Sequence, residues 1–321
     1  MITLPTYSSR AAKESVFKAC LFCDSESEVK GWLEEISAGD YGKGFAFRGV
    51  KLASYMLFTS LQREWITRSL KDRFTDHHLP VRELLNAARR MSAEYGGGVP
   101  QEIKCIEPED ELGLLSFLQH YECPTPLLDF TSDIRVALYF ATERSSALAA
   151  PAYLDNYFSI YTFSEEIIAL MNGGLEKSWH KHVETRFMDA RRIFKSYKVI
   201  GAQDTLIFHP ERHDKVYGKD IIPLWNSPRI QVQKGLFASN STADVPFPEA
   251  VQAFVNRKTD NAVMRNSIKS WINSINIHRD YAPMVVEWLE RQDPPMTKAH
   301  LLPVRPEHGR VKGLLEVVLN G

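Results

Sequence analysis

The feature that most constrains this chain is the stretch of residues 114–141, where three predicted elements follow one another with little between them. Apolar residues recur at helical spacing over residues 114–120, which predicts a helix. A turn that contains two prolines ends this helix, and the two leucines at 127–128 predict a short buried strand. Residues 133–143 again carry apolar side chains along one face, which predicts a second helix.

Polar side chains gather where these apolar elements begin and end. Residues 129–132 form a predicted elbow, in which Thr131 or Ser132 is a suitable N-cap for the next helix because a hydroxyl accepts from amides of the first turn. The other polar residues at element ends are Gln119, His120, Tyr121 and Asp129. Two interpretations follow from this pattern: a functional site, or a buried helix–strand–helix unit whose polar ends are hydrogen-bonded.

Composition and charge narrow the class of protein. The chain has 321 residues, of which 44% are hydrophobic and 11% aromatic, enough for a sizeable core in one or two globular domains. Its net charge of −1 excludes a global field that would attract nucleic acid or an anionic membrane, so an anionic ligand needs a local basic patch.

The sequence contains no recognisable signal for secretion or membrane insertion. Its N-terminal residues contain no apolar run typical of a secretory signal, and no window approaches a membrane span. Cys20 and Cys23 have the spacing of half a zinc site, but no second such pair exists. We therefore expect a cytoplasmic protein with reduced thiols, no metal site and no membrane partner.

The flanking segments predict an α+β protein. Helices are predicted over residues 13–37, 81–95, 165–170, 250–254, 263–275 and 282–289. Strands are predicted over residues 44–50, 157–163, 205–208 and 221–225, with a last strand that ends near residue 319. Since no linker clearly divides the chain, one elaborated domain is the simplest account.

Two other stretches bear on function. Residues 229–237 have the alternation of a strand, which places Arg229, Gln231 and Gln233 on one face. Such a face fits a lined cleft, and it equally fits a half-exposed edge strand. Residues 176–198 are rich in lysine and arginine, which fits a solvated helix face or a surface for an anionic target such as nucleic acid.

Three motifs, in order, resemble the FRG domain, a family named for its Phe-Arg-Gly motif. The first is Phe47-Arg48-Gly49, with Leu61-Gln62-Arg63 after it. The second runs from Gln119-His120-Tyr121 through Pro124-Thr125 and Leu127-Leu128-Asp129 to residues 137–141, and the third is Arg229, Gln233, Gly235 and Phe237. The resemblance covers about residues 40–240. The sequence departs from the family pattern at Glu122, where glycine is usual, and at Pro126, where arginine is usual.

The resemblance implies a split mixed β-sheet core of the ADP-ribosyltransferase-like kind, with helical N- and C-terminal elaborations and NAD held in its cleft as a substrate. It implies a helical N-terminal extension at residues 1–39, the FRG domain at residues 40–290, and a tail with a strand at residues 291–321. The residues implied to bind NAD are Arg48, Tyr55, Arg63, Tyr121, Asp129, Thr131 and Tyr139.

The catalytic residues implied by the resemblance are Arg48, His120 and Gln233. A planar guanidinium grips a diphosphate bidentately, and an imidazole orients a ribose hydroxyl or transfers a proton. Each assignment has a structural alternative: a strand-end salt bridge for Arg48, a hydrogen-bonded histidine for His120, and core packing for the tyrosines. For Asp129 we favour an electrostatic role that shapes the cleft.

The implied function is that of an NAD-dependent ADP-ribosyltransferase acting as a toxin or anti-phage defence effector. It would cleave the nicotinamide–ribose bond and transfer ADP-ribose to an unknown acceptor, protein or nucleic acid, under the control of a cognate antitoxin or other regulatory partner. Gln233 stands where related transferases usually carry a catalytic glutamate, and it supplies no full negative charge. Two alternatives therefore stay open: a non-catalytic nucleotide-binding sensor, and an NAD glycohydrolase.

Overall fold

The strands of the sheet are arranged in an order different from their order in the chain. The computed structural model describes residues 2–17, 19–39, 45–93, 111–143, 152–164, 205–208, 232–240, 242–258, 272–302, 311 and 313–320. Its strands are β1 (Ala19–Cys23), β2 (Phe45–Val50), β3 (Leu127–Thr131), β4 (Tyr157–Ser164), β5 (Thr205–Phe208), β6 (Gly235–Asn240) and β7 (Ile272–His278). They form a seven-stranded sheet in the order β1-β7-β4-β2-β3-β6-β5. Among the described strands only β1 and β7 pair in parallel, so the predicted α+β class with a mixed sheet is confirmed.

The join between β2 and β3 interrupts this sheet. β2 pairs with β4 at six positions and β3 pairs with β6 at five, whereas β2 and β3 are in register only at Phe47 and Thr131. The ladder of backbone hydrogen bonds therefore does not continue across the middle of the sheet. Polar groups of these two strands are left available for side chains or a ligand.

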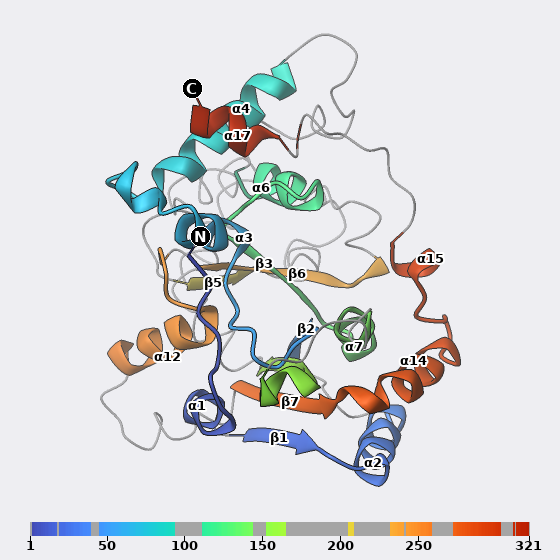
Figure 1. Ribbon diagram of the computed structural model, residues 1–321. Helices are drawn as coiled ribbons and strands as arrows, with labels where there is room; N and C mark the ends of the chain where they lie inside the picture. Colours follow the sequence, from blue (N-terminus) through green and yellow to red (C-terminus); the bar gives the residue numbers. More distant parts are fainter. Residues whose placement is uncertain are drawn as a thin grey trace.

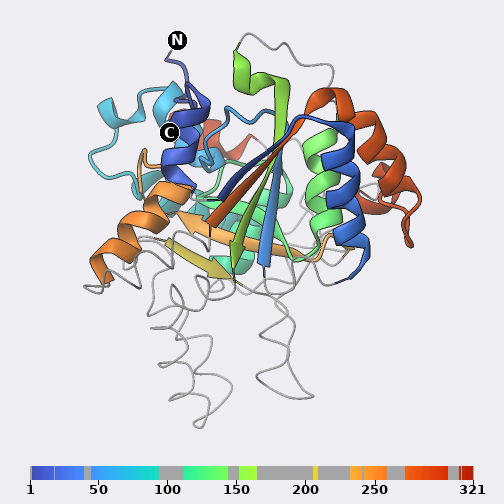
Figure 2. The ribbon, with the colours of Figure 1, turned by 90° about the horizontal axis from the view of Figure 1, so that it is seen from below.

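Helices cover both faces of the sheet. Those on the β1-β7-β4-β2 part are α1 (Arg10–Val16), α2 (Glu26–Ser37), α7 (Ile134–Thr142) and α14 (Ala282–Glu290). The helix α12 (Phe247–Lys258) lies across both parts, since Phe247 packs against Phe130 of β3 and Phe163 of β4. Figure 2 shows α2, α7 and α14 on one face and α1 and α12 on the other. Near β3 and β6 lie α3 (Ser60–Thr67), α4 (Leu79–Ala93), α6 (Glu111–His120) and α17 (Leu314–Asn320), as Figure 1 shows, and the short helix α15 (Lys298–Leu301) follows α14. No helix in the described ranges has the length and apolar character needed to cross a membrane.

Three apolar cores hold these layers together. The first, with Phe47, lies between β2, β4, β7 and the helices α2, α7 and α14. The second, with Phe130, lies on the opposite face of the sheet and is shared by strands on both sides of the β2–β3 join. The third, with Phe237, packs β3 and β6 against α3, α4, α6 and α17. Each fully buried large apolar side chain contributes about 1.5–3 kcal/mol, so the sheet remains one unit although its ladder is interrupted.

A buried lysine fastens α1 to the sheet. Lys13 is 0% exposed, and its Nζ donates to the Ala53 carbonyl at 2.8 Å, to Ser159 Oγ at 2.8 Å and to Asn276 Oδ1 at 2.7 Å. The ring of Tyr161 lies 4.7 Å from the same nitrogen. Burial lowers the pKa of Lys13 to about 7, because the charged form loses its hydration.

The N-terminal prediction was wrong in part, since residues 13–37 are not one helix. α1 ends at Val16, and residues Ala19–Cys23 form β1, which pairs with Asn273–Ile277 of β7. A short apolar run suits a strand as well as a helix, and here pairing with β7 decides between them. The first 39 residues therefore contribute an edge strand to the sheet instead of an all-helical extension.

The C-terminal prediction of a strand was also wrong. Val311, Leu314, Leu315 and Leu319 are buried and recur at the spacing of one helix face, and α17 packs that face against α4. The valines at 317 and 318 favoured a strand in the sequence, but no neighbouring strand lies there within the described residues. The predicted helix over 263–275 fails at its end, because β7 begins at Ile272, and residues before that lie outside the described ones.

The predictions around the second and third motifs needed smaller changes. β3 extends through Thr131, so Asp129 and Thr131 belong to a strand, and the N-cap of α7 is Asp133, which accepts from the amide of Arg135 at 3.0 Å. Gln233 lies in a turn before β6, which begins at Gly235, so the predicted strand does not include it. Arg229, Gln231, the strand at 221–225, the helix at 165–170 and the basic segment 176–198 lie outside the described residues.

Candidate functional site

The three residues of the Phe-Arg-Gly motif contact three different parts of the structure. Phe47 is buried at 1% exposure in the core beneath α7. Gly49 has the α7 backbone directly above it, and a Cβ there would lie 1.9 Å from the carbonyl oxygen of Ala137. Only glycine permits this approach of helix to strand. Arg48 reaches the interruption between β2 and β3.

The side chain of Arg48 replaces one of the backbone hydrogen bonds that are missing between β2 and β3. Its Nη1 donates to the backbone carbonyl of Asp129 on β3 and lies 3.9 Å from the Asp129 carboxylate. Its Nε is buried and has no hydrogen-bond partner among the described residues. Burial lowers the pKa of Arg48 and the charge of Arg63 lowers it further, while Asp129 acts in the opposite direction. An anion between the two guanidiniums would relieve both costs.

Asp129 is oriented by the second motif. Gln119, near the end of α6, donates from Nε2 to the Asp129 carboxylate at 2.9 Å, and its Oε1 accepts from the Thr125 hydroxyl at 2.5 Å. The fully buried Thr125 thus fixes the amide, and the amide fixes the carboxylate beside Arg48. The electrostatic role that we favour for Asp129 stays a prediction.

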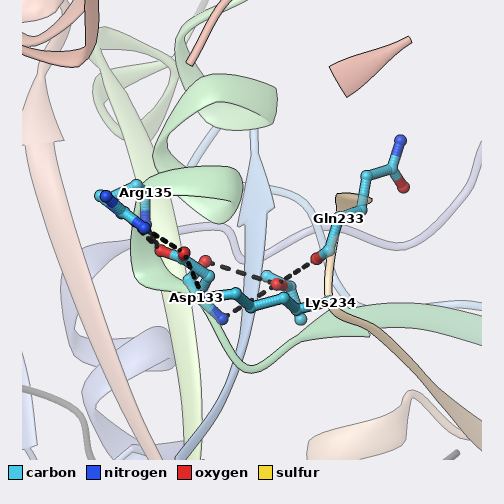
Figure 3. A network of polar contacts seen from close by, with 5 residues as sticks. Asp133, Arg135, Gln233 and Lys234 are labelled. Atoms are coloured by element: carbon cyan, nitrogen blue, oxygen red, sulfur yellow. Dashed lines mark hydrogen bonds and ion pairs between the residues drawn. The ribbon is translucent and has the colours of Figure 1, made fainter. Parts of the chain in front are cut away.

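A polar network joins β3, the start of α7 and the turn before β6 (Figure 3). Thr131 Oγ1 donates to the Gln233 carbonyl at 2.6 Å. The Asp133 carboxylate forms ion pairs with Arg135 at 2.7 Å and with Lys234 at 3.2 Å. Burial would raise the pKa of Asp133, but the hydrogen bonds and charge of Arg135, with the charge of Lys234, outweigh burial and lower it. Asp133 is therefore a structural anchor that stays ionised.

The side chain of Gln233 points away from this network (Figure 3) and toward the C-terminal segment. Its Nε2 donates to the Leu301 carbonyl at 2.8 Å. This bond fixes the amide, whose Oε1 can accept hydrogen bonds, so Gln233 offers an acceptor rather than a charge. Lys234 beside it has a left-handed backbone with φ 46°, which turns the chain into β6.

These elements enclose a cavity of about 450 Å³ between β2, β3 and the ends of α6 and α7. That volume lies in the range of small-molecule pockets, about 300–1,000 Å³. Its lining includes the predicted residues Arg48, Tyr55, Arg63, His120, Asp129, Thr131 and Gln233. The structure thus brings together side chains that lie up to 185 residues apart in the sequence, from Arg48 to Gln233.

Two predicted residues lie elsewhere. Tyr121 is 4% exposed in the third core, with its ring 4.7 Å from that of Phe117. Tyr139 is half-buried on α7 beside Phe140, and burial raises its pKa, with a further contribution from Glu143. The helical turn that directs Tyr139 toward the core presents Phe140 to the cavity instead.

The structure adds a charged pair that sequence reasoning missed. Lys51 and Glu143 both line the cavity, with Lys51 Nζ 3.5 Å from the Glu143 carboxylate. The signal for Lys51 was its place two residues after the first motif, but nothing in the spacing linked it to Glu143 at the end of α7. Arg63 also lines the cavity, and its guanidinium has no hydrogen bond or ion pair to any described residue. The cavity therefore holds one cation without a protein partner in the described part of the chain, which favours an anionic ligand.

The backbone at Glu122 shows why glycine is usual at this position of the family pattern. It has φ 62°, and the amide of Cys123 donates to the Leu118 carbonyl at 2.9 Å while that of Glu122 donates to the Gln119 carbonyl at 3.0 Å. These two bonds end α6 in a Schellman motif, whose left-handed position suits glycine. Glutamate there keeps the turn at a conformational cost, and the residue does not line the cavity.

Comparison with known protein families matches residues 43–149 to the FRG domain. The chain therefore contains an FRG domain, and the matched range includes the first two motifs and every cavity residue named above except Gln233. No curated protein and no solved structure matches the chain.

Proposed function

We propose that this FRG domain protein is an NAD-dependent enzyme with an ADP-ribosyltransferase-like core, which cleaves the nicotinamide–ribose bond and transfers ADP-ribose to a protein or nucleic acid. The observation that carries the proposal is the pair of guanidiniums, Arg48 and Arg63, that face one cavity at the interruption of the sheet. We further propose a cytoplasmic toxin or anti-phage effector under the control of an antitoxin or regulatory partner.

The charges of the cavity suit a dinucleotide. Arg48 has a buried Nε without a partner, and Arg63 has a guanidinium without one in the described residues, so a diphosphate between them would gain charge-assisted hydrogen bonds. Aromatic faces at Tyr55 and Phe140 offer stacking surfaces for a base or for nicotinamide. His120 at the end of α6 lines the same cavity, where an imidazole would orient a ribose hydroxyl.

The reaction breaks the C1′–N bond heterolytically. Nicotinamide leaves as a neutral molecule with the bonding electron pair, and positive charge develops on the ribose ring. A nucleophilic atom of the acceptor then bonds to C1′ and loses its proton. A carboxylate near the ring stabilises this cation, and the cavity offers two, Asp129 beside Arg48 and Glu143 beside Lys51.

A nucleotide-binding sensor is the second candidate. It is favoured by Gln233, whose amide is held by the Leu301 carbonyl and which brings no carboxylate to the position where related transferases usually have one. A sensor would bind NAD or a similar nucleotide through the same arginines without releasing nicotinamide. An NAD glycohydrolase would release nicotinamide and leave free ADP-ribose, with water as the acceptor.

The test is to incubate the purified chain with labelled NAD and cell extract, with and without nuclease, and to follow nicotinamide release and the fate of the label. Transfer predicts labelled macromolecule; free ADP-ribose indicates hydrolysis; binding without release indicates the sensor. Loss of one charge-assisted pair costs about 1.5–3 kcal/mol, so Arg48→Ala should weaken NAD binding roughly 10- to 150-fold. Unchanged binding in Arg48→Ala, or no binding by the wild type, contradicts the proposal.

Matched variants distinguish the roles of the two carboxylates. Asp129→Asn and Glu143→Gln each remove one charge and keep the size of the side chain. The variant that lowers nicotinamide release while NAD affinity is retained identifies the carboxylate that faces the ribose, because that contact strengthens in the transition state. If neither variant changes release, cation stabilisation by a cavity carboxylate is refuted.

A further inference from the structure

The turn before α4 brings two imidazoles and a carboxylate together, away from the FRG cavity. Asp76, His77 and His78 each offer one ligand atom, and these atoms lie within 4.8 Å of one another. The ring centroids of His77 and His78 are 3.9 Å apart. All three residues are half-buried, so a ligand bound among them would be partly shielded from water.

The carboxylate is already held in one orientation. Asp76 Oδ1 accepts from the backbone amide of His78 at 2.9 Å, and Oδ2 pairs with Arg82 of α4 at 2.8 Å. Partners of this kind orient a metal-binding carboxylate and support its affinity.

A small cavity adjoins both histidines and supplies room for one more ligand. Its lining includes His77, His78, Gln62 and Asn240, and about 20 Å³ is open to water. A single buried water needs about 10–15 Å³ and two or more polar partners. The amides of Gln62 and Asn240 on its wall already hydrogen-bond to Thr242 and Val245, so the ion itself would hold the water.

We propose that Asp76, His77 and His78 bind a divalent transition-metal ion of the zinc class, with a water molecule in the fourth position. Two imidazoles and one carboxylate are a ligand set that suits Zn²⁺ and its neighbours, whereas Mg²⁺ and Ca²⁺ prefer oxygen ligands. Ligands about 2.0–2.1 Å from a tetrahedral ion lie roughly 3.3 Å from one another. The ligand atoms, now within 4.8 Å of one another, would therefore approach by up to about 1.5 Å when the ion binds.

The experiment uses the full chain after treatment with a chelator, titrated with Zn²⁺ by calorimetry and with Co²⁺ by visible absorption. We expect one ion per chain, an absorption band of four-coordinate Co²⁺, and no comparable heat with Mg²⁺. Loss of a direct ligand should weaken binding at least as much as loss of an outer partner, about 10- to 100-fold. His77→Ala and His78→Ala test this, and His300→Ala in α15 removes a histidine outside the cluster as a control.

Asp76→Asn keeps the acceptor for the His78 amide and removes the charge, so it tests ligation without removing the bond that shapes the turn. Circular dichroism shows whether each variant is folded. Tight binding that persists in His77→Ala and His78→Ala would overturn the proposal and direct attention to Cys20 and Cys23. Absence of Zn²⁺ and Co²⁺ binding by the folded wild type would overturn it as well.

Discussion

Replacement of the buried lysine should change how the stability of the fold depends on pH. The perturbation is Lys13→Met, which keeps an unbranched side chain of similar length and removes the amine. Asn276 Oδ1 retains two other donors in the variant, Ser159 Oγ at 2.6 Å and Ser274 Oγ at 3.1 Å. The variant therefore loses the titrating group and one hydrogen bond to the Ala53 carbonyl, and the loss of that hydrogen bond does not depend on pH in the variant.

The magnitude follows from the pKa of Lys13, which falls from its ordinary value of 10.5 to about 7 in the folded chain. Between these values the unfolded chain holds a proton that the folded chain has released, so the free energy of unfolding rises with pH across this window. The slope is at most about 1.4 kcal/mol per pH unit, and the full span is on the order of 5 kcal/mol. Below pH 7 both states are protonated and the cost of the buried charge is constant.

The assay is urea unfolding at several pH values from 7 to 9, for the wild type and Lys13→Met. We expect the stability of the wild type to gain roughly 2 kcal/mol relative to the variant over that range. The difference between the two proteins matters because other groups whose pKa is raised by burial, such as the Cys23 thiol, contribute equally in both. The exposed Lys30→Met is the control and should leave the pH dependence unchanged. Parallel curves for wild type and Lys13→Met would refute the reasoning.

Three further tests, two of them with a matched comparison variant, probe the packing and the site. Gly49→Ala should destabilise the fold by about 1–3 kcal/mol or more in urea unfolding, because its Cβ meets the α7 backbone; Gly31→Ala, with open space around it in α2, should instead stabilise by about 0.5–1 kcal/mol. Glu122→Gly should raise stability by about 1 kcal/mol by relieving the left-handed turn, and a loss would contradict the Schellman assignment. Arg63→Ala should weaken NAD binding at least about tenfold in calorimetry, while Arg68→Ala, at the other end of α3, should not; equal effects would exclude a specific contact.

Strong helical periodicity correctly predicted most of the long helices, but predictions made from short apolar runs were wrong. The helix predicted over residues 81–95 is confirmed as α4, Leu79–Ala93, since one apolar face extends over four turns. Ala19–Cys23 and the C-terminal residues 311–319 were assigned the wrong element, because each run is short enough to suit either structure. For β1 the deciding factor is pairing with β7, and for α17 it is packing on α4; neither partner is visible in the local sequence.

The candidate site was predictable where the family pattern supplied it. Arg48, Asp129 and Gln233 were placed around one cleft by the resemblance, and the structure brings them to one cavity. Lys51 and Glu143 were missed because their pairing depends on how closely α7 approaches β2, a distance that Gly49 determines. Sequence periodicity does not report such a distance.

The Phe-Arg-Gly motif meets three requirements at successive positions of β2. Phe47 anchors the single registered pair with β3, and Gly49 admits the helix that carries Glu143. Between them, Arg48 donates a side-chain hydrogen bond to the Asp129 carbonyl, where a continuing ladder would use a backbone amide. A ladder closed over residues 48–51 would leave no cavity between the strands. We therefore infer that the arginine has a structural role in keeping β2 and β3 apart as well as a charge for the ligand, and that Arg48→Lys, which keeps the charge but loses the planar fork, would retain only part of the binding.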